Sequence, residues 1–569
     1  MVRREPYLLA VASRAALTRS DATQTLLDIF PGTAAFVRIA ARNFDAAAPM
    51  EAIHQTAEAS AQYYNLLRAT CTDFALESDM LGLKAVYSAQ TPAGAVLASR
   101  IADVLDMFPG LAQPADLTAL YESLGFWTAL GERTLYRHIQ RTLPGGCYRW
   151  TSADGLAGQR SRRLDPTPVE PYWFMDQAIA SVRAASRDSV REKTAGAPGS
   201  IWLALSGGFD SRFIAALCRD LRLPIRVVSY GRPHHREWPS TKEVARTLEL
   251  DLTMLRQGRD ATLHYLTNHL DATEGTADCA SVSIMNLMGA RAAIGDTLLH
   301  GFCGDVLSGG HIDPFSAADY ASRDATADAI VRHAYPASKV NLHGLFTPAP
   351  DLDAVRQDVL DGLRSDCPAY QAYLLWYAEN RTRRYVASHF AVLGEHFDTV
   401  SPFYDRRLFA LWFSIPPVGL SGQTTLRQLL ARCYPALARI PHAEESASII
   451  PNLHWQIARF LRSAPERVLS GCIGATRAKR QLLRLYLNSD FRSLSKLAAP
   501  QQQAYMLSRI SMLQPILHEM FGVTLSPQYR NILSTNLQAL RTLFTVASYA
   551  ERQSNRARAD NKRAAADPP

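Results

Sequence analysis

One short stretch constrains the fold of this chain more than any other. An apolar run at residues 201–205, typical of a buried strand, breaks into a Ser-Gly-Gly turn at 206–208, and apolar residues then return at helical spacing. Glycines in such a turn let a ligand approach the backbone, and the N–H groups of the turn and of the first helical turn point at an anion. An ordinary capped strand-to-helix connection is the alternative, but the full Ser-Gly-Gly-x-Asp-Ser string favours a nucleotide pyrophosphate. The residues predicted to bind the nucleotide here are Leu205, Ser206, Gly207, Gly208, Asp210 and Ser211.

A second glycine-containing turn follows another apolar run, residues 297–300. Strands that alternate with helices predict a parallel sheet with helices on both faces, in which ligands bind at the carboxyl ends of the strands. Asp305 lies between glycines at such an end, and Mg²⁺ takes one or two carboxylates together with phosphate oxygens. We therefore expect Asp210 and Asp305 to hold Mg²⁺ beside the nucleotide. Three further residues predicted to contact the nucleotide are Tyr230, Gly301 and Gly304.

These motifs resemble the PP-loop of enzymes that split ATP between its α- and β-phosphates and leave an adenylate on the substrate. Residues 301–310 are similar to the G-x-G-x-D-E-x-x-x-G-G element of asparagine synthetase, although Val306 stands where that group has Glu. Residues 398–408 resemble the E-x-R-x-P-F-L-D-x-x-L element of the same group. The resemblance covers about residues 75–450 and implies ATP and Mg²⁺ as cofactors.

The resemblance also implies catalytic residues. Asp398 falls where the group has a glutamate that, in lactam-forming members, helps to orient the base near the attacking amine. The synthetases use a lysine further along the chain, but this sequence has no lysine between Lys339 and Lys479. A cation is still needed when pyrophosphate or AMP leaves. Arg381 and Arg383, with Arg384 beside them, are the candidates, and a solvated helix face is the alternative interpretation.

The chain is too long for one hydrophobic core. We expect an α/β protein with three parts: a degenerate glutaminase-like, Ntn-type α+β domain at 1–165, an asparagine-synthetase-like ATP-binding domain at 170–480 with a parallel sheet and a helical C-terminal part, and a helical extension with a disordered basic tail at 481–569. Strand-like runs at 81–88 and 95–99, separated by a turn at 91–94, predict a hairpin in the first domain. The same domain is similar to the glutaminase domain in its G-x-R-T-x-Y and L-x-P-G-G ending, residues 131–146.

One departure from the glutamine-dependent members concerns their nucleophile. Those members use an N-terminal cysteine, exposed by removal of the initiator methionine, to hydrolyse glutamine. Here Val2 follows Met1 and the first cysteine is Cys71, so glutaminase activity is not expected. The first domain is then expected to act as a scaffold or as a peptide-binding surface.

Bulk properties exclude several classes of protein. No apolar run reaches the ~20 residues that span a bilayer, and no secretory signal precedes the first domain, which predicts a cytoplasmic location. The eight cysteines form no C-x-x-C pair for a metal or redox site. Much of the net charge of +8 lies near the C-terminus without an RNA-binding motif, so a solvated tail is favoured over nucleic-acid binding.

A reaction in which the substrate itself carries the attacking amine needs no ammonia. The absence of the glutaminase nucleophile therefore fits the lactam-forming enzymes best. Among these the overall plan resembles a lasso-peptide cyclase. The expected function is ATP-dependent macrolactam synthesis: an Asp or Glu side chain of a core peptide is adenylated, and the N-terminal amine of the peptide closes an isopeptide bond, with AMP and pyrophosphate released. The resemblance implies a precursor peptide as substrate, with a leader-peptide protease and a leader-binding protein as partners. The alternatives are an ammonia-dependent asparagine-synthetase-like or β-lactam-synthetase-like amide ligase on a small acid, and a nucleotide-binding scaffold without activity.

Overall fold

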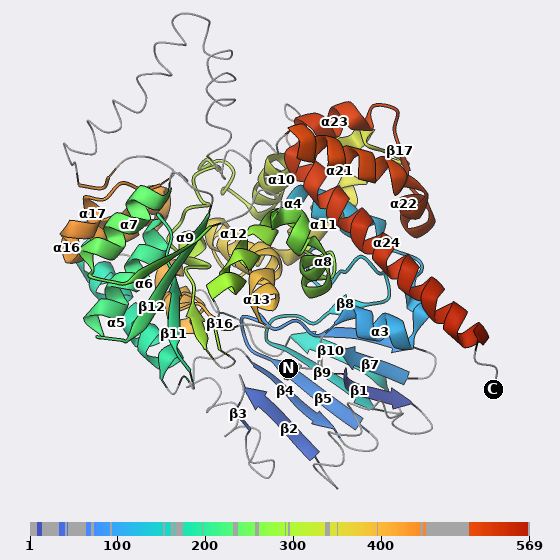
Figure 1. Ribbon diagram of the computed structural model, residues 1–569, viewed down its shortest axis with the longest axis horizontal. Coiled ribbons are helices and arrows are strands. Elements are labelled where there is room, and N and C mark those ends of the chain that lie inside the picture. The colour runs from blue at the N-terminus through green and yellow to red at the C-terminus, as the bar shows by residue number, and fades with distance from the viewer. Residues whose placement is uncertain are drawn as a thin grey trace, which may run out of the picture.

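The computed structural model combines antiparallel sheets, a parallel sheet and many helices (Figure 1). The residues that it describes are 8–13, 34–39, 42–43, 64–69, 73–91, 94–98, 100–151, 154–160, 164, 174–195, 197, 199–231, 237–256, 261–290, 292–293, 296–335, 342–349, 351–394, 397–443, 448–450 and 500–566. Val2, Cys71 and the predicted boundaries at 165–170 and at 480 lie outside them. The division at those boundaries stays a prediction.

The N-terminal unit contains two antiparallel sheets, with strand orders β1-β7-β6-β8 and β10-β9-β5-β4-β2-β3. Buried side chains of β5, β7 and β9 form a small core of their own, which includes Leu76, Leu97 and Trp150. Whether this unit is glutaminase-like stays a prediction. The strands are β1 (Leu8–Ser13), β2 (Ala34–Ile39), β3 (Arg42–Asn43), β4 (Tyr64–Ala69), β5 (Asp73–Ser78), β6 (Tyr87–Thr91), β7 (Gly94–Ala98), β8 (Gln140–Arg141), β9 (Gly146–Thr151) and β10 (Gly155–Arg160). The helical elements of the unit are α3 (Ile101–Met107), η1 (Pro109–Ala112) and α4 (Leu117–Phe126).

The predicted hairpin is confirmed as β6 and β7, which pair antiparallel with Thr91 opposite Gly94. Its first strand begins at Tyr87 rather than at residue 81. The reason is a turn at Gly82, which has a φ of +55° and donates its N–H to Asp79. A side chain is disfavoured at such a φ, so glycine fixes the chain reversal there.

The parallel sheet that the sequence predicts is present. Its five strands have the order β13-β12-β11-β14-β16, and all neighbouring pairs are parallel. The chain therefore adds β12 and β13 on one side of β11 and then β14 and β16 on the other, which places a switch point between the ends of β11 and β14. The strands are β11 (Ile201–Ala204), β12 (Ile225–Gly231), β13 (Leu252–Arg256), β14 (Thr297–Leu299) and β16 (Asp398–Val400).

Helices cover both faces of this sheet, because successive residues of a strand point to opposite sides. Leu203 packs into the large core shared with the helices of one face, whereas Trp202 and Ala204 pack into a separate cluster with η2 and α13 on the other. The helical segments around the sheet are α5 (Met175–Thr194), α6 (Phe209–Asp220), α7 (Glu237–Thr247), α8 (Ala261–Thr273), η2 (Cys279–Ala290), α9 (Gly304–Leu307), α13 (Ser388–Leu393), α14 (Arg406–Phe413), α15 (Pro417–Leu420), η5 (Ser421–Gln423), α16 (Thr424–Cys433) and α17 (Pro435–Ala438).

A helical layer completes the described part of the chain and lies above the N-terminal sheets in Figure 1. In this layer α12 continues directly into the π-helical segment η4. The three candidate arginines, Arg381, Arg383 and Arg384, all lie on η4. The elements of this layer are α10 (Arg323–Ala334), η3 (Leu342–Gly344), β15 (Phe346–Thr347), α11 (Leu352–Gly362), α12 (Ala369–Tyr377), η4 (Ala378–Val386), α21 (Pro500–Met512), α22 (Gln514–Phe521), β17 (Thr524–Leu525), α23 (Tyr529–Thr535) and α24 (Leu537–Ala566).

The predicted disordered tail is wrong as far as Ala566, because α24 runs through this basic stretch to that residue. Arg552, on α24, pairs with Asp271 of α8 at 2.6 Å, and the first half of the helix buries apolar residues such as Leu543 and Ala547. Packing of the N-terminal half thus extends the helix into a sequence that is polar on its own. None of the described helices combines the length and the apolarity needed to cross a bilayer.

The fold makes a testable prediction about Glu122 of α4, which is fully buried and accepts a hydrogen bond from the Leu130 N–H at 2.8 Å. Burial raises the pKa of Glu122 to about 8. Because its folded-state pKa lies above the unfolded value, the folded state binds the extra proton and loses stability as the pH rises between about 4.5 and about 8. Glu122→Gln, which keeps the shape without the charge, should lose this part of the pH dependence.

The measurement is the apparent Tm of both proteins at pH 5.5 and pH 8.5. The wild type should lose more degrees across this interval than Glu122→Gln. Glu249→Gln, on an exposed surface ion pair with Arg219, is the matched control and should keep the wild-type slope. Equal slopes for all three proteins would show that Glu122 is ionised throughout.

Candidate active site

The Ser-Gly-Gly turn follows β11, and hydrogen bonds between Ser206 of the turn and Ser211 of α6 close it. The Leu205 N–H donates to the carbonyl of Val228 at 2.9 Å, which ends the strand. Ser211, in the first turn of α6, accepts a hydrogen bond from the Ser206 N–H at 3.0 Å, and the two hydroxyl oxygens are 2.9 Å apart. Gly208 is the N-cap residue of α6 and offers no side-chain cap. The first N–H groups of this twelve-residue helix are therefore available to an anion.

A second segment, residues 437–443, is hydrogen-bonded to the turn and to Arg212 of α6. Arg212 is fully buried and donates to the carbonyl groups of Gly207, Leu437, Ile440 and Pro441. The Ala443 N–H donates back to Gly207 O at 3.1 Å. These bonds fix the shape of the turn against residues 437–443.

The two predicted metal carboxylates come from neighbouring strand ends. Asp210 lies in the first turn of α6, and Asp305 lies in the first turn of α9, after β14. Gly304 allows this approach, because a Cβ at that position would lie 2.5 Å from Cγ and 2.6 Å from Oδ1 of Asp210. Gly301 also lies close, since its Cβ would be 3.1 Å from the Ser211 nitrogen. The packing of one turn against the other thus requires a glycine at 304 and leaves little space for a side chain at 301.

Electrostatics indicate that this pair of carboxylates suits a cation. Oδ1 of Asp210 is buried and has no hydrogen-bond partner among the described residues, whereas half of the Asp305 side chain is exposed. Burial, together with the nearby charge of Asp305, raises the pKa of Asp210 well above its ordinary value. A divalent cation between the two carboxylates would remove this cost.

The residues fit Mg²⁺ bound jointly with a nucleotide. Among the described residues no group of three His, Cys, Asp or Glu side chains forms an all-protein metal cage. Mg²⁺ is usually bound by one or two carboxylates plus phosphate oxygens and water. Asp210 and Asp305 would supply the carboxylates, and the adjacent N-terminus of α6 would hold the phosphates.

The structure thus brings most of the predicted nucleotide and metal residues together. Leu205 is the last buried residue before the turn, and Tyr230 lies near the carboxyl end of β12, the strand beside β11. The residues gathered at the ends of β11 and β14 are Ser206, Gly207, Gly208, Asp210, Ser211, Gly301, Gly304 and Asp305.

Asp398 does not lie with this group. It is the first residue of β16 and pairs with Thr297 at the amino end of β14, next to Asp296, whose carbonyl accepts its N–H at 2.9 Å. In a parallel sheet this is the edge opposite the turn, about 10 Å away along the strand at about 3.3 Å per residue. The position does not support the predicted catalytic role, because only the residues after Val400 reach the carboxyl edge.

The three arginines of η4 separate in space. Arg383 is buried and donates to carbonyl groups of Gly82 and Thr142 in the N-terminal unit, and Arg384 donates to Gly131 and Arg133 there. These contacts fix the unit in place and do not support the catalytic role predicted for Arg383. Arg381 instead donates to the hydroxyl of Tyr377 at 3.0 Å. Its positive charge also contributes to lowering the pKa of Asp305.

Two residues near the turn were missed from the sequence. The guanidinium of Arg427 lies 4.9 Å from the ring centroid of Phe209, the first residue of α6, and the ring of His442 lies 4.4 Å from the same ring. Arg427 gives a positive charge beside the phosphate-binding helix end. His442 lies in the lysine-free stretch between Lys339 and Lys479, which was the available signal, whereas nothing in the sequence singled out Arg427.

A first prediction for the site concerns Gly304. A Cβ there would overlap Asp210 and force the two turns apart, which costs about 1–3 kcal/mol. Gly304→Ala should therefore weaken ATP binding in the presence of Mg²⁺ by about 10–100-fold, measured by calorimetry. Gly110→Ala is the control, because nothing lies within 4 Å of its Cβ. Wild-type affinity of Gly304→Ala would show that the two turns can separate freely.

A second prediction separates the two aspartates of the sequence motifs. Asp305→Asn should weaken Mg²⁺-dependent ATP binding about tenfold or more, because one metal carboxylate is lost. Asp398→Asn should leave this affinity unchanged, because Asp398 lies at the opposite edge of the sheet. A loss in Asp398→Asn similar to that in Asp305→Asn would place Asp398 back in the site.

Comparison with known proteins agrees with this geometry. Residues 181–471, more than half of the chain, match the model of the asparagine synthase family, and the match includes β11, α6, β14, α9 and the acidic pair. The comparison with curated proteins found no match. This match shows that the chain belongs to the asparagine synthase family of ATP-dependent ligases that form amide bonds.

Proposed function

We propose that this protein is a lasso-peptide macrolactam synthetase, which activates an Asp or Glu side chain of a core peptide and joins it to the N-terminal amine of the same peptide. The observation that carries the first half of the proposal is the buried, unpartnered Oδ1 of Asp210 beside Asp305, among the residues that the structure describes. This pair lies at the switch point of a parallel sheet, next to an uncapped helix N-terminus. The arrangement suits the α- and β-phosphates of ATP with Mg²⁺.

The first chemical step is adenylation. A carboxylate oxygen of the peptide attacks the α-phosphorus of ATP, the bond to the β-phosphate oxygen breaks, and pyrophosphate leaves. The N–H groups of the turn and of α6 bind the phosphates, and Asp210 and Asp305 would hold Mg²⁺, which supplies charge neutralisation for the leaving pyrophosphate. Arg427, beside Phe209, adds a positive charge at the same helix end.

The second step forms the amide. The neutral N-terminal amine attacks the carboxyl carbon of the acyl-adenylate, the bond to AMP breaks, and the amine loses a proton. The product is an isopeptide bond that closes a ring. Holding the two ends of one peptide close together supplies most of what this step needs.

The nitrogen source favours a lactam over an ammonia-dependent product. Residues 1–70 contain no cysteine, and Cys147, the cysteine described in the N-terminal unit, is buried in β9. Hydrolysis of glutamine needs an accessible, activated nucleophile, and in the glutamine-dependent members that this chain resembles the nucleophile is a cysteine thiolate. An amine carried by the substrate requires neither glutamine nor ammonia.

A cavity lies outside the predicted nucleotide and metal residues, none of which lines it, and it offers space for part of a larger substrate. It measures about 990 Å³ and lies between the N-terminal unit and the helical layer. Charged groups of both signs line it, among them Glu132, Arg137, Asp361 and Arg364. Its volume lies at the upper end of the range for ligand pockets and therefore leaves room for a peptide segment as well as for a small acid. A peptide substrate also implies a leader-peptide protease and a leader-binding protein as partners, in the cytoplasm and without nucleic acid.

The proposal predicts a definite product. With ATP, Mg²⁺ and a leaderless core peptide, the product should weigh one water less than the linear peptide, and AMP and pyrophosphate should form alongside it. Mass spectrometry and nucleotide chromatography measure both. A core peptide that is acetylated at its N-terminus should not cyclise, because the electron pair of an amide nitrogen is delocalised into the carbonyl group and the nitrogen is not nucleophilic.

Two other outcomes would replace the proposal. Incorporation of free ammonia into a linear peptide or a small acid would favour the asparagine-synthetase-like or β-lactam-synthetase-like alternative. ATP binding without pyrophosphate release from any peptide would favour a nucleotide-binding scaffold.

A further inference from the structure

We infer that the N-terminal unit positions the Asp305 carboxylate for the cation through a chain of four side chains, Trp127, Arg381, Tyr377 and His311. This inference rests on the proposed function only in assigning Asp305 to the cation. The cysteine that the structure describes in the N-terminal unit is buried. The inference therefore gives this unit a role in the site that does not depend on a thiol.

The chain begins at Asp305. Its Oδ2 lies 3.1 Å from Nε2 of His311, and Nδ1 of His311 lies 3.3 Å from the hydroxyl of Tyr377. The His311 and Tyr377 rings also stack, with centroids 4.6 Å apart and planes 22° from parallel. The hydroxyl of Tyr373 donates to the carbonyl of His311 and fixes its backbone as well.

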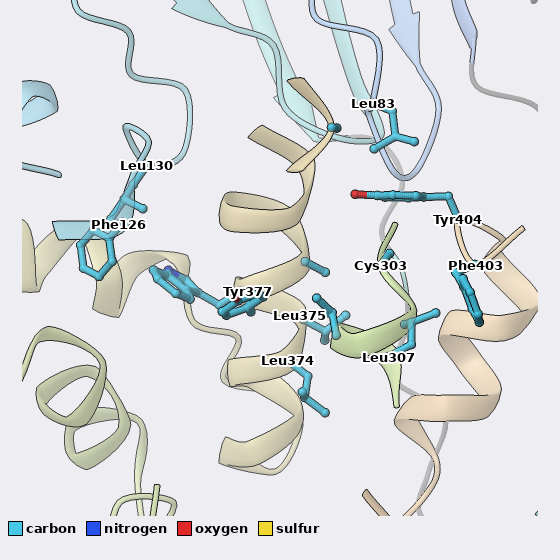
Figure 2. Packing of buried hydrophobic residues seen from close by; sticks show 14 of the residues in the cluster. Leu83, Phe126, Leu130, Cys303, Leu307, Leu374, Leu375, Tyr377, Phe403 and Tyr404 are labelled. Carbon is cyan, nitrogen blue, oxygen red and sulfur yellow. The ribbon is translucent and has the colours of Figure 1, made fainter. Parts of the chain in front are cut away.

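The chain continues to the N-terminal unit. Nε of Arg381 donates to the Tyr377 hydroxyl at 3.0 Å, and its Nη1 donates to Phe126 O at 3.0 Å. The guanidinium lies 3.3 Å from the ring centroid of Trp127. Trp127 follows α4 in the left-handed conformation, with a φ of 69°, and its ring packs against Arg381 and Tyr385 of η4. Figure 2 shows Tyr377 on α12 between Phe126 of the N-terminal unit and Leu307 of α9.

The hydrogen bonds of the chain agree in direction. The Arg381 Nε–H donates to the Tyr377 oxygen. With the His311 proton assigned to Nε2, the Tyr377 O–H donates to Nδ1 of His311 and the Nε2–H donates to Asp305. One tautomer of His311 satisfies every bond. Partners of this kind orient a metal-binding carboxylate and are worth about 10–100-fold in metal affinity.

Two neighbouring arginines keep the far end of the chain in place. Arg383 and Arg384 are buried, and their hydrogen bonds to described residues end on backbone carbonyl and hydroxyl oxygens of the N-terminal unit. Thr382, between these two residues and Arg381, is fully buried as well. Because η4 is anchored to the N-terminal unit directly after Arg381, the position of the Arg381 guanidinium depends on the docked unit.

The test uses Mn²⁺ as the probe, with a non-hydrolysable α,β-methylene analogue of ATP, and measures Mn²⁺ affinity by electron paramagnetic resonance. Tyr377→Phe keeps the stacked ring but breaks both hydrogen bonds, and it should weaken Mn²⁺ binding by about 10–100-fold. Trp127→Leu, at the far end of the chain, should weaken it in the same direction. This second variant keeps the test open if Tyr377→Phe does not fold.

The matched control is Tyr335→Phe. Tyr335 also donates its hydroxyl to the N-terminal unit, at Tyr121 O, and among the described residues it has no bond to the chain that ends at Asp305. Its variant should bind Mn²⁺ like the wild type. Wild-type affinity in both Tyr377→Phe and Trp127→Leu would overturn the inference, and so would an equal loss in Tyr335→Phe.

The proposed function can fail separately from this inference. A wild type that binds Mn²⁺ with the ATP analogue but forms no lactam overturns the macrolactam proposal alone, and the variant affinities still decide the inference. A wild type that binds no Mn²⁺ with the analogue overturns the inference, whatever product the enzyme makes.

Discussion

The carboxyl group of Asp210 packs against Gly304, the residue directly before Asp305, where two neighbouring parallel strands end, and the rest of the site depends on this contact. Gly304 makes the contact possible, because a Cβ there would overlap the carboxyl group of Asp210. The approach is costly without a cation, since Asp210 is desolvated and lies beside a like charge. The Ser-Gly-Gly turn, which is predicted to bind phosphate, lies beside the same carboxylates. Binding of a cation and binding of a nucleotide are therefore expected to support each other.

The packing of the N-terminal unit explains why buried charge collects on η4. Arg383 and Arg384 are both buried without a carboxylate partner among their hydrogen bonds to described residues, and carbonyl oxygens of the N-terminal unit solvate them instead. Burial of a charge without such partners is costly. Separation of the unit from the helical layer would break the hydrogen bonds between these guanidinium groups and carbonyl groups. The unit is thus an integral part of the fold around the site.

The local part of the site could be predicted from the sequence. Ser206, Asp210 and Ser211 lie within one strand–turn–helix segment, and short-range hydrogen bonds between the two serines determine its shape. Asp305 was predictable for the same reason, because glycines on both sides mark a tight turn after an apolar strand. The parallel sheet followed from strands that alternate with helices. These features depend on residues that are close in sequence.

The sequence by itself determined the strand–turn–helix shape of the Ser-Gly-Gly segment and which carboxylates follow the strands, because neighbouring residues specify backbone conformation. Only the tertiary structure decided how remote side chains pair. Asp398 matched a motif but starts its strand at the wrong edge, and strand register cannot be derived from the motif alone. Arg381 and Arg383 are two residues apart, yet one approaches Tyr377 and the other enters the N-terminal unit. Helix geometry and long-range packing set those directions, and neither is encoded within a short stretch of chain.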